Sequence, residues 1–319
     1  MNLGNPDRPV GGLAVPRPTG VEIRPLGRED FADAIALARE LYVLDAGADM
    51  EPLRPVYEAL VNDPDATPFL ALADGEAAGL IVQRFRRRLN HATFEGWISD
   101  LVVRERFRGR GIGRALLAST IAEWRLRGGH QMMLEVSYDR TAARALYESA
   151  GFENQGKYFE IGPIKTRGIS ADAIEIRPIR NDDADFAATT GLLAELKRPA
   201  PTDEKLPALR RTYDQHVARA DTGSMLALRD GIPVGFISLE MRQPFFTTRQ
   251  QAWIPDLVVT EAARGHKVGA ALLDAAFVEA IRRDCYAAAL ESGHHRDVAH
   301  QLYLGAGMSD VGSFYTLQR

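Results

Sequence analysis

The sequence has a single cysteine, no long apolar run and little net charge. Cys285 alone cannot form an internal disulfide, and no Cys/His cluster has the spacing of a zinc site. No segment approaches the roughly 18 consecutive apolar residues that a transmembrane helix needs. A net charge of −4 gives no overall attraction to nucleic acid or anionic lipid. These absences predict a cytoplasmic protein that has no metal and whose partners are neither nucleic acids nor membranes.

The length of the chain indicates how many domains it can form, and its first residues indicate how it begins. Its 319 residues suffice for two domains of about 150 residues each. Residues 1–19 are rich in glycine and proline and contain no apolar stretch behind basic residues, so they do not indicate a targeting segment. We expect them to form a flexible arm.

The sequence repeats itself at an offset of 156 residues. The run WISDLVV at 97–103 returns as WIPDLVV at 253–259, and the segments 97–151 and 253–307 share 23 identities in 55 positions. Chance would give roughly four. A period this long indicates a duplicated domain rather than a solenoid of short repeats. We predict an N-terminal domain at 20–172 and a C-terminal domain at 173–319.

Both copies indicate the same order of elements. Asp-Gly pairs between apolar runs, at 74–75 and 230–231, predict a β-hairpin in each copy. Helical periodicity predicts helices at 30–42, 53–62, 112–127 and 140–150, and at 183–196, 203–217, 268–283 and 296–306. Further strands are expected at 93–103, 131–137, 250–259 and 286–292, with two closing strands in each copy. The fold class is therefore α+β, each domain a mixed, mostly antiparallel, twisted sheet flanked by helices.

A glycine-rich turn between a strand and a helix is the most informative local feature. Gly109, Gly111 and Gly113 let the backbone approach a ligand closely, and the N–H groups that begin the helix favour an anion. Neighbouring arginines add charged donors. The pattern indicates a pyrophosphate site. A dinucleotide-binding turn would need the spacing GxGxxG in a parallel unit, a Walker A loop would need Gly-Lys-Ser/Thr, and a turn with no ligand is the remaining alternative.

Two motifs in this order resemble the GNAT superfamily of N-acyltransferases. Arg108-x-x-Gly111-x-Gly113 after a Val-Val strand is similar to its acetyl-CoA-binding signature, and Leu146-Tyr147-x-x-x-Gly151-Phe152 to its C-terminal signature. The resemblance covers both copies. It implies two tandem GNAT-like domains that use acetyl-CoA as donor and need no metal.

The resemblance also implies roles for single residues. The backbone of Leu101 and Val103 would pair with the pantetheine arm of acetyl-CoA, and the Val103 amide would stabilise the oxyanion. Tyr147 would protonate the departing thiolate as general acid. The pyrophosphate would lie on the turn formed by Arg108, Gly109, Arg110, Gly111, Ile112, Gly113 and Arg114.

The general base has two candidates on one strand, Glu95 and Asp100. We rank Glu95 first as base, and Asp100 first as a structural or substrate contact, since a carboxylate in an apolar strand is costly to bury without a partner. Strand alternation places the two on opposite faces unless a bulge intervenes. His91 and His130 match no motif of the family, and we interpret both as histidines of surface loops.

The second copy departs from these motifs. Its turn reads Arg264-Gly265-His-Lys267-Val-Gly269, with lysine at the place of Gly111. Its candidate donor contacts are Val259, Arg264, Gly265 and Gly269. Glu95 corresponds to Gln251, which cannot act as a base, whereas Asp256 and Tyr303 correspond to Asp100 and Tyr147. We hypothesise that the first copy catalyses, that the second completes the architecture, and that the chain is a monomeric pseudo-dimer.

The expected activity is acetyl transfer from acetyl-CoA to an amine of a small molecule or peptide. A degenerate GNAT domain that senses or binds CoA is one alternative, and an acetyltransferase similar to mycothiol synthases is another. The sequence does not identify the acceptor. The segments 42–55 and 198–214, which differ between the copies, are expected to shape its pocket.

Overall fold

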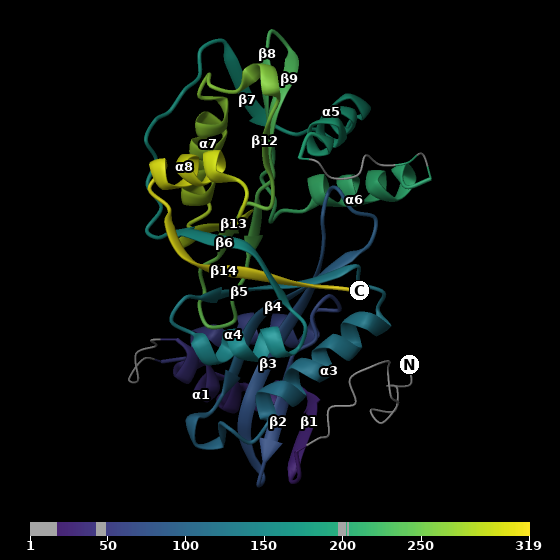
Figure 1. Cartoon of the computed structure of the whole chain (residues 1–319), viewed down its shortest axis with the longest axis vertical. Helices are drawn as coiled ribbons and strands as arrows, with labels where there is room; N and C mark the ends of the chain where they lie inside the picture. The colour runs from purple at the N-terminus through teal and green to yellow at the C-terminus, as the bar shows by residue number, and fades with distance from the viewer. Residues whose placement is uncertain (1–17, 43–48, 197–201, 203) are drawn as a thin grey trace.

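The computed structural model describes residues 18–42, 49–196, 202 and 204–319, so the predicted arm lies almost wholly outside the described residues. The first copy forms the lower part of the molecule in Figure 1 and the second copy the upper part. Within the described ranges, no helix is both long enough and apolar enough to cross a membrane.

Apart from the closing strands, the order of elements predicted from the sequence is present in both halves. In the first half the elements are β1 (Val21–Pro25), α1 (Phe31–Leu41), α2 (Arg54–Asn62), β2 (Phe69–Ala73), β3 (Glu76–Arg87), β4 (Phe94–Val103), α3 (Ile112–Leu126), β5 (Gln131–Ser137), α4 (Thr141–Ser149) and β6 (Glu153–Ile161). In the second half they are β7 (Ile174–Pro178), α5 (Asp183–Ala194), α6 (Leu206–Ala218), β8 (Met225–Arg229), β9 (Ile232–Ile237), β10 (Glu240–Arg242), β11 (Gln251–Trp253), β12 (Leu257–Val259), α7 (Val268–Arg282), β13 (Ala287–Gly293), α8 (Asp297–Gly305) and β14 (Ser309–Gln318).

Local chemistry explains several of these boundaries. Both Asp-Gly pairs adopt the left-handed conformation, with φ of 55° and 80° at Asp74 and Gly75 and of 52° and 77° at Asp230 and Gly231. Two successive positive φ values are typical of the type I′ turns that join tight hairpins. Helix α5 begins where the side chain of Asp182 accepts a hydrogen bond from a backbone N–H of its first turn.

The strands form one ten-stranded sheet and one four-stranded sheet. Their orders are β1-β2-β3-β4-β5-β14-β6-β13-β11-β10 and β12-β9-β8-β7. Two neighbouring pairs are parallel, β4 with β5 and β11 with β13, and the other named pairs are antiparallel. The α+β class with a mostly antiparallel sheet is therefore confirmed.

The closing strands differ from the prediction. Each half supplies one such strand rather than two, and the halves exchange them: β14 of the second half lies between β5 and β6, and β6 in turn pairs with β13. Figure 1 shows β14 crossing the molecule beside β5. The repeat could not reveal this exchange, because equivalent strands carry equivalent patterns. The division near residue 172 stays a prediction, since the large sheet extends across both copies.

An irregularity occurs at the same place in each copy. In β4 the register with β3 shifts, so that Asp100 pairs with Val82, Ile98 pairs with Gln83, and Ser99 is an extra residue. Without such a β-bulge, strand alternation would place Glu95 and Asp100 on opposite faces of β4. In the second copy the corresponding residue is Pro255, which has no N–H for the ladder, and the predicted strand 250–259 divides into β11 and β12.

Helices cover both faces of the first half's strands. Leu116, Ile121 and Trp124 of α3 belong to one buried apolar cluster, and α1 and α2 contribute Leu37 and Tyr57 to another. In the second half α7 packs in the same way as α3. These layers hold the ends of β4 and β12, and the turns that follow them, in fixed positions.

Candidate functional site

A gap opens between β4 and β5. The two strands pair only from Glu95–Ile98 to Gln131–Leu134. Beyond this point the Arg104 N–H donates to the carbonyl of Ala78 on β3, at 2.9 Å. Because backbone groups alternate along a strand, the N–H groups of Leu101 and Val103 then face the other way, toward the gap. In the part of the chain that the structure describes, β4 therefore presents an edge there that no other strand pairs with.

The glycine-rich turn lies at the end of this edge. Gly109 and Gly111 have φ of 78° and 80°, and a Cβ on Gly109 would have no atom within 4 Å. A Cβ on Gly113 would come within 3.3 Å of the Leu146 side chain, so glycine allows α4 to pack against the turn. The first N–H groups of α3, which have no acceptor within the helix, point out at this place.

The charged residues of the turn are exposed and held near the gap. The Arg108 Nε donates to the Val103 carbonyl at 3.1 Å, and Arg110 forms an ion pair of 2.8 Å with Asp74. Arg114 is exposed on the first turn of α3, whereas the Ile112 side chain is buried. Ile112 can therefore offer a ligand only its backbone, while the three arginines can offer charge.

The second half keeps the path of this turn. The Arg264 Nε donates to the Val259 carbonyl at 3.2 Å, and Gly265 has φ of 80°. Lys267 adopts φ of 60°, a conformation rare for residues with a side chain, in the position that Gly111 occupies in the first half. A Cβ on Gly269 would meet Leu302 at 3.4 Å. The backbone of Lys267 therefore adopts the left-handed conformation that Gly111 has, and the path of the turn is unchanged.

A cavity of about 220 Å³ lies beside the gap in the first half. Its walls include Tyr42, Ser99, Asp100, Glu135, Tyr158 and Glu160, and the second half contributes Gln251 and Phe246. The ring of Tyr42 stacks on that of Phe246 with 3.6 Å between ring centroids. The cavity is thus lined by carboxylates of the first half, by the arginines Arg84 and Arg242, and by aromatic rings from both halves.

Neutral groups hold two of the carboxylates of this cavity, whereas Glu135 pairs with Arg242 at 3.2 Å. Asp100 accepts hydrogen bonds from the hydroxyls of Tyr42 and Ser99, the latter at 2.6 Å. Glu160 accepts from the Gln251 amide at 2.8 Å. Burial raises the pKa of both Asp100 and Glu160 above the ordinary values. Burial also raises the pKa of Glu135 to about 8. These groups are poised to take up a proton.

Tyr147 lies near Asp100. It is buried on α4, and its pKa is raised first by burial and then by the negative charge of Asp100. A phenol with a raised pKa keeps its proton at neutral pH. Tyr147 is thus near enough to Asp100 to be affected by its charge, although it does not line the first cavity.

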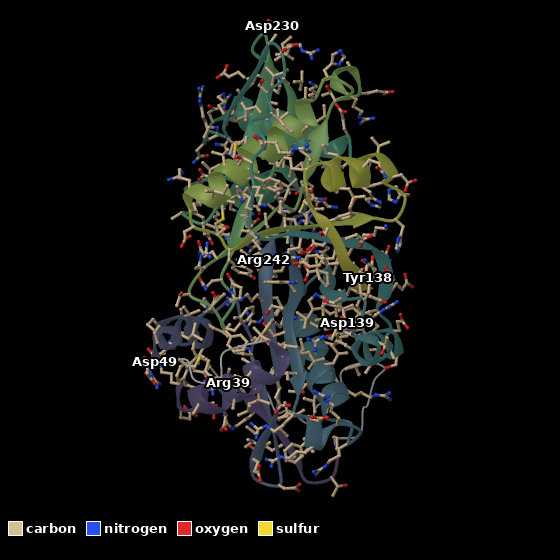
Figure 2. The ribbon with its side chains drawn as sticks, turned by 90° about the vertical axis from the view of Figure 1, so that its left-hand side faces the viewer. Arg39, Asp49, Tyr138, Asp139, Asp230 and Arg242 are labelled. Atoms are coloured by element: carbon tan, nitrogen blue, oxygen red, sulfur yellow. The ribbon has the colours of Figure 1, made fainter. Side chains whose placement is uncertain are left out.

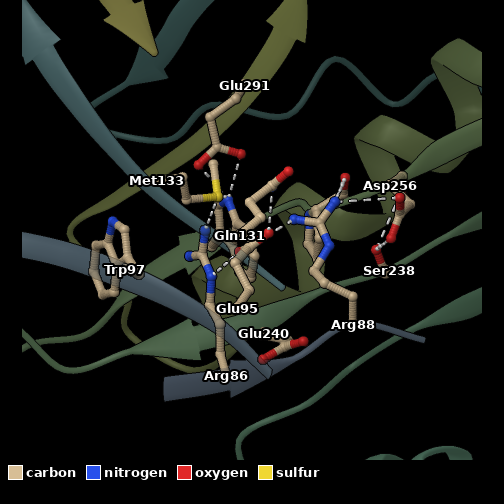
Figure 3. A network of polar contacts seen from close by, with 12 residues as sticks. Arg86, Arg88, Glu95, Trp97, Gln131, Met133, Ser238, Glu240, Asp256 and Glu291 are labelled. Carbon is tan, nitrogen blue, oxygen red and sulfur yellow. Dashed lines mark hydrogen bonds and ion pairs between the residues drawn. The ribbon is translucent and has the colours of Figure 1, made fainter. Parts of the chain in front are cut away.

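Glu95 lies elsewhere. Its carboxylate pairs with Arg86 at 2.5 Å, accepts from Gln131 at 3.0 Å and lies 3.9 Å from Arg88, as Figure 3 shows. Burial alone would raise its pKa, but Arg86 and Arg88 outweigh burial and lower it. Glu95 lines a different cavity, which Asp256 and Tyr303 also line. The geometry thus does not support the prediction of Glu95 as the base beside Tyr147.

This second cavity, of about 340 Å³, is the counterpart of the first. Each cavity is completed by the other half, because Gln251 lies in the first cavity and Glu95, its counterpart in the repeat, lies in the second. Sequence reasoning missed this exchange, since an offset between copies does not tell which cavity a side chain faces. It also missed Tyr42, Glu160 and Arg88, which carry no motif.

The remaining titratable candidates do not extend the site. The rings of His91 and His130 stack with 3.5 Å between centroids, and burial lowers the pKa of His130 to about 4. Neither ring lines the first cavity. In the described part of the chain, no group of three or more His, Cys, Asp or Glu side chains is arranged to hold a metal ion.

The raised pKa of Asp100 predicts a pH-dependent effect on stability. The folded protein binds this proton more tightly than the unfolded chain, so Asp100 costs stability as pH rises above its ordinary value of 3.8. Asp100→Asn is expected to raise the thermal midpoint at pH 7 by roughly 3 °C, with the gain shrinking toward pH 4. Calorimetry between pH 4 and 8 measures this difference, and a gain that does not depend on pH would contradict the assignment.

Comparison with known proteins places these features in a family. The model of the acetyltransferase (GNAT) family matches residues 33–152 and again 190–308. An aminoalkylphosphonate N-acetyltransferase of Salmonella typhimurium is 33% identical over 132 residues, which cover 41% of this chain and 84% of that protein. An aminoglycoside N(6′)-acetyltransferase of Stenotrophomonas maltophilia is 31% identical over 125 residues, 38% of this chain and 81% of that protein.

Solved structures agree over the length of both halves. A GCN5-related N-acetyltransferase from Sphaerobacter thermophilus has a TM-score of 0.61 at 22% identity, covering 94% of this chain and 96% of that one. A tandem GNAT protein from the clavulanic acid biosynthesis pathway has a TM-score of 0.58 at 17% identity, covering 93% and 98%. At these identities the likeness supports the fold. With both halves matched by the family model, the chain belongs to the acetyltransferase (GNAT) family, in a tandem form.

Proposed function

We propose that the first half transfers an acetyl group from acetyl-CoA to an amine of a small molecule or peptide. The observation that supports this most directly is the meeting of three features at one end of β4. These are the free edge of the strand, the glycine-rich turn, and the cavity with Asp100. A donor along the edge and an acceptor in the cavity would meet beside Asp100 and Tyr147.

The residues present fit acetyl-CoA, which supplies the reactive thioester. The free N–H groups of Leu101 and Val103 suit the amides of an extended pantetheine arm, which would join the edge like an added strand. The open space at Gly109 and the helix start after Gly111 suit a pyrophosphate. Arg108 and Arg114 add charge at this place, while Arg110 is shared with Asp74.

The cavity suits a protonated amine as acceptor. Asp100 and Glu160 accept hydrogen bonds from neutral donors, so their charges are not cancelled by direct ion pairs. The aromatic rings of Tyr42 and Phe246 can face a cation. The two curated relatives are named for an aminoalkylphosphonate and an aminoglycoside, which both carry amines. They support the amine class without selecting one acceptor.

Two side chains carry out the proton transfers, Asp100 as acceptor and Tyr147 as donor. Asp100, whose pKa is raised by burial, accepts the proton that the ammonium must lose before its nitrogen can attack. The amine nitrogen bonds to the acetyl carbon and the carbon–sulfur bond breaks. The Val103 N–H donates to the oxygen that gains charge. Tyr147, which keeps its proton at neutral pH, gives it to the leaving sulfur.

Charge reversal on the two turns tests which half binds the donor. Arg108→Glu is expected to raise the KM for acetyl-CoA about tenfold or more, because a carboxylate would repel the pyrophosphate. Arg264→Glu is the matched variant in the second half, and we expect it to leave that KM within twofold. Initial rates of CoA release over a panel of amines give both values.

The same assay separates transfer from binding alone. Acetyl-CoA turnover stimulated by an amine supports the proposed activity. Donor binding without turnover on any amine of the panel, from diamines to aminoglycosides and peptides, would favour the alternative of a CoA-binding module. An equal effect of Arg108→Glu and Arg264→Glu would refute the assignment of donor binding to the first half alone.

A further inference from the structure

A loop of the second half is anchored in the first half. It comprises residues 243–250, between β10 and β11. Phe245 is buried in an apolar cluster whose other buried members all come from the first half. The Arg84 Nη2 donates to the Gln243 carbonyl at 3.1 Å, and the Gln243 amide donates to two carbonyls of the loop itself, at 3.0 Å and 2.7 Å. These contacts fix the loop, and Phe246 with it, beside the first cavity.

Phe246 contacts a tyrosine of the first half. Its ring stacks on that of Tyr42, with 3.6 Å between ring centroids and 23° between ring planes. Tyr42 follows the last residue of α1 in an extended conformation, with φ of −118° and ψ of 149°, so the helical backbone no longer sets the direction of its side chain. The Tyr42 hydroxyl donates to the Asp100 carboxylate. The ring of Phe246 therefore fixes the place of a hydroxyl that holds Asp100.

Tyr42 is one of several ionisable groups that interact with Asp100. The others are Arg84 of β3, Tyr147 of α4 and Tyr286, which directly precedes β13. Burial raises the pKa of Asp100, whereas the hydrogen bonds from Ser99 and Tyr42 and the charge of Arg84 lower it. Loss of the hydrogen bond from Tyr42 should therefore raise the pKa of Asp100 further above its ordinary value.

The equivalent loop of the first half has no ring at this position. At the offset of 156 residues, Phe246 corresponds to Asn90 and Phe245 to Leu89. Leu89 is buried in an apolar cluster whose other buried members all come from the second half, so each half inserts this loop into the other. The exchange of loops is common to both copies, whereas the ring is a feature of the second. Phe246 is therefore not explained by the shared architecture.

We propose that Phe246 of the second half is a positioning residue for acetyl transfer in the first half: it fixes Tyr42, whose hydroxyl orients the Asp100 carboxylate. The inference rests on the proposed function, in which Asp100 accepts the ammonium proton. It gives the second half a part in the reaction besides its part in the shared sheet. Because Phe246 acts through Tyr42, its loss should change kcat and the pH profile rather than the KM for the amine.

Rates of CoA release with saturating amine, measured as a function of pH, test the proposal. Phe246→Leu keeps an apolar side chain but no ring, and it should move the rising limb of kcat about one pH unit higher, which lowers kcat about tenfold at a pH on that limb. Tyr42→Phe keeps the stack without the hydroxyl and should do the same. In the double variant the second substitution should add less than twofold, because both remove the same hydrogen bond. Phe246→Tyr restores a ring and should recover most of the rate.

The repeat supplies a matched control. Asn90→Ala changes the half-buried counterpart of Phe246, which is not among the described residues that line either cavity, and it should leave kcat and the limb within twofold. Thermal melts check that each variant folds. An unchanged limb in Phe246→Leu would overturn the proposal. A rise confined to the KM for the amine would also overturn it, since Phe246 would then contact the acceptor directly.

A readout without turnover separates this proposal from the proposed function. If no amine stimulates the unmodified chain, the proposed function fails, but the contact between Phe246 and Asp100 through Tyr42 can still be measured. Asp100 costs stability as pH rises toward its raised pKa, so in Phe246→Leu this loss should extend about one pH unit higher than in Asn90→Ala. The difference should vanish when Asp100→Asn is added to both. Equal pH dependence of the thermal midpoint in Phe246→Leu and Asn90→Ala would overturn the positioning role.

Discussion

A chain that ends at Met308, before β14, is expected not to fold as either half. Strand β14 pairs with β5 over Gly312–Gln318 and with β6 over Ser309–Thr316, so its removal leaves each of these two interior strands with an unpaired edge and separates the large sheet into two parts. It also removes Tyr315, which is fully buried. The lost pairing and apolar burial exceed the roughly 5–15 kcal/mol by which a domain is usually stable. Circular dichroism and gel filtration should show an unfolded or aggregated chain.

A shorter truncation is the control. A chain that ends at Leu317 loses only Gln318 and Arg319, which are exposed, and should fold like the intact protein. Both this chain and the full one are expected to elute as monomers of about the 35.1 kDa sequence mass, because β14 already joins the halves within one chain. A cooperatively folding monomer from residues 1–308 would show that each half is independent, contrary to the exchanged topology.

The local elements were predictable because each has a local cause. Alternating and helical apolar patterns gave the elements around the hairpins, and the left-handed residues at 74–75 and 230–231 are the ones that type I′ turns require. The glycine-rich turn was equally predictable, since glycines placed directly before an apolar helix indicate a turn that needs positive φ. The predicted fold class, family and position of the turn follow from such signals.

The pairing between halves was not predictable, because it depends on long-range contacts. At the centre Arg86 and Arg242, equivalent in the repeat, lie 3.7 Å and 3.8 Å from the ring centroid of Trp253. Trp97 and Trp253 donate to Glu135 and Glu291, which hydrogen-bond each other. Figure 2 shows Arg242 at the waist where the halves meet. In the sequence each of these residues is only a charge or a ring in a strand.

The same long-range pairing explains why Glu95 lies away from the first cavity. Glu95 occupies a position where a catalytic glutamate was expected, and the motif carried no information about the strand that faces it. Once the halves share one sheet, Glu95 meets Arg86 and Arg88 and turns toward the second cavity. Asp100, after the bulge at Ser99, remains beside the gap with Tyr147. A bulge and an exchange, neither visible in composition, thus decide which of the two acids lines the first cavity.

Substitution of the acid–base groups should therefore separate Asp100 from Glu95. Asp100→Asn is expected to lower kcat about 100-fold at pH 7, because the amide cannot accept the ammonium proton. Tyr147→Phe should lower kcat to a similar extent by removing the proton donor to sulfur. Glu95→Gln should cost less than tenfold, since that carboxylate is paired with Arg86 in the other cavity. Steady-state rates of CoA release with saturating amine measure the three variants.

The dependence of kcat on pH should distinguish the roles of Asp100 and Glu95. With Asp100 as base, kcat should rise with pH through the raised pKa of that group and then level off, and the rise should vanish in Asp100→Asn. Glu95→Gln should keep the profile of the unmodified enzyme, because the pKa of Glu95 is lowered and the group is ionised throughout. If instead Glu95→Gln abolished both turnover and the rising limb, while Asp100→Asn kept them, Glu95 would be the base and the second cavity the site of reaction. Matched folding of the variants, checked by thermal melts, makes this comparison decisive, since the two acids lie on one strand but face different cavities.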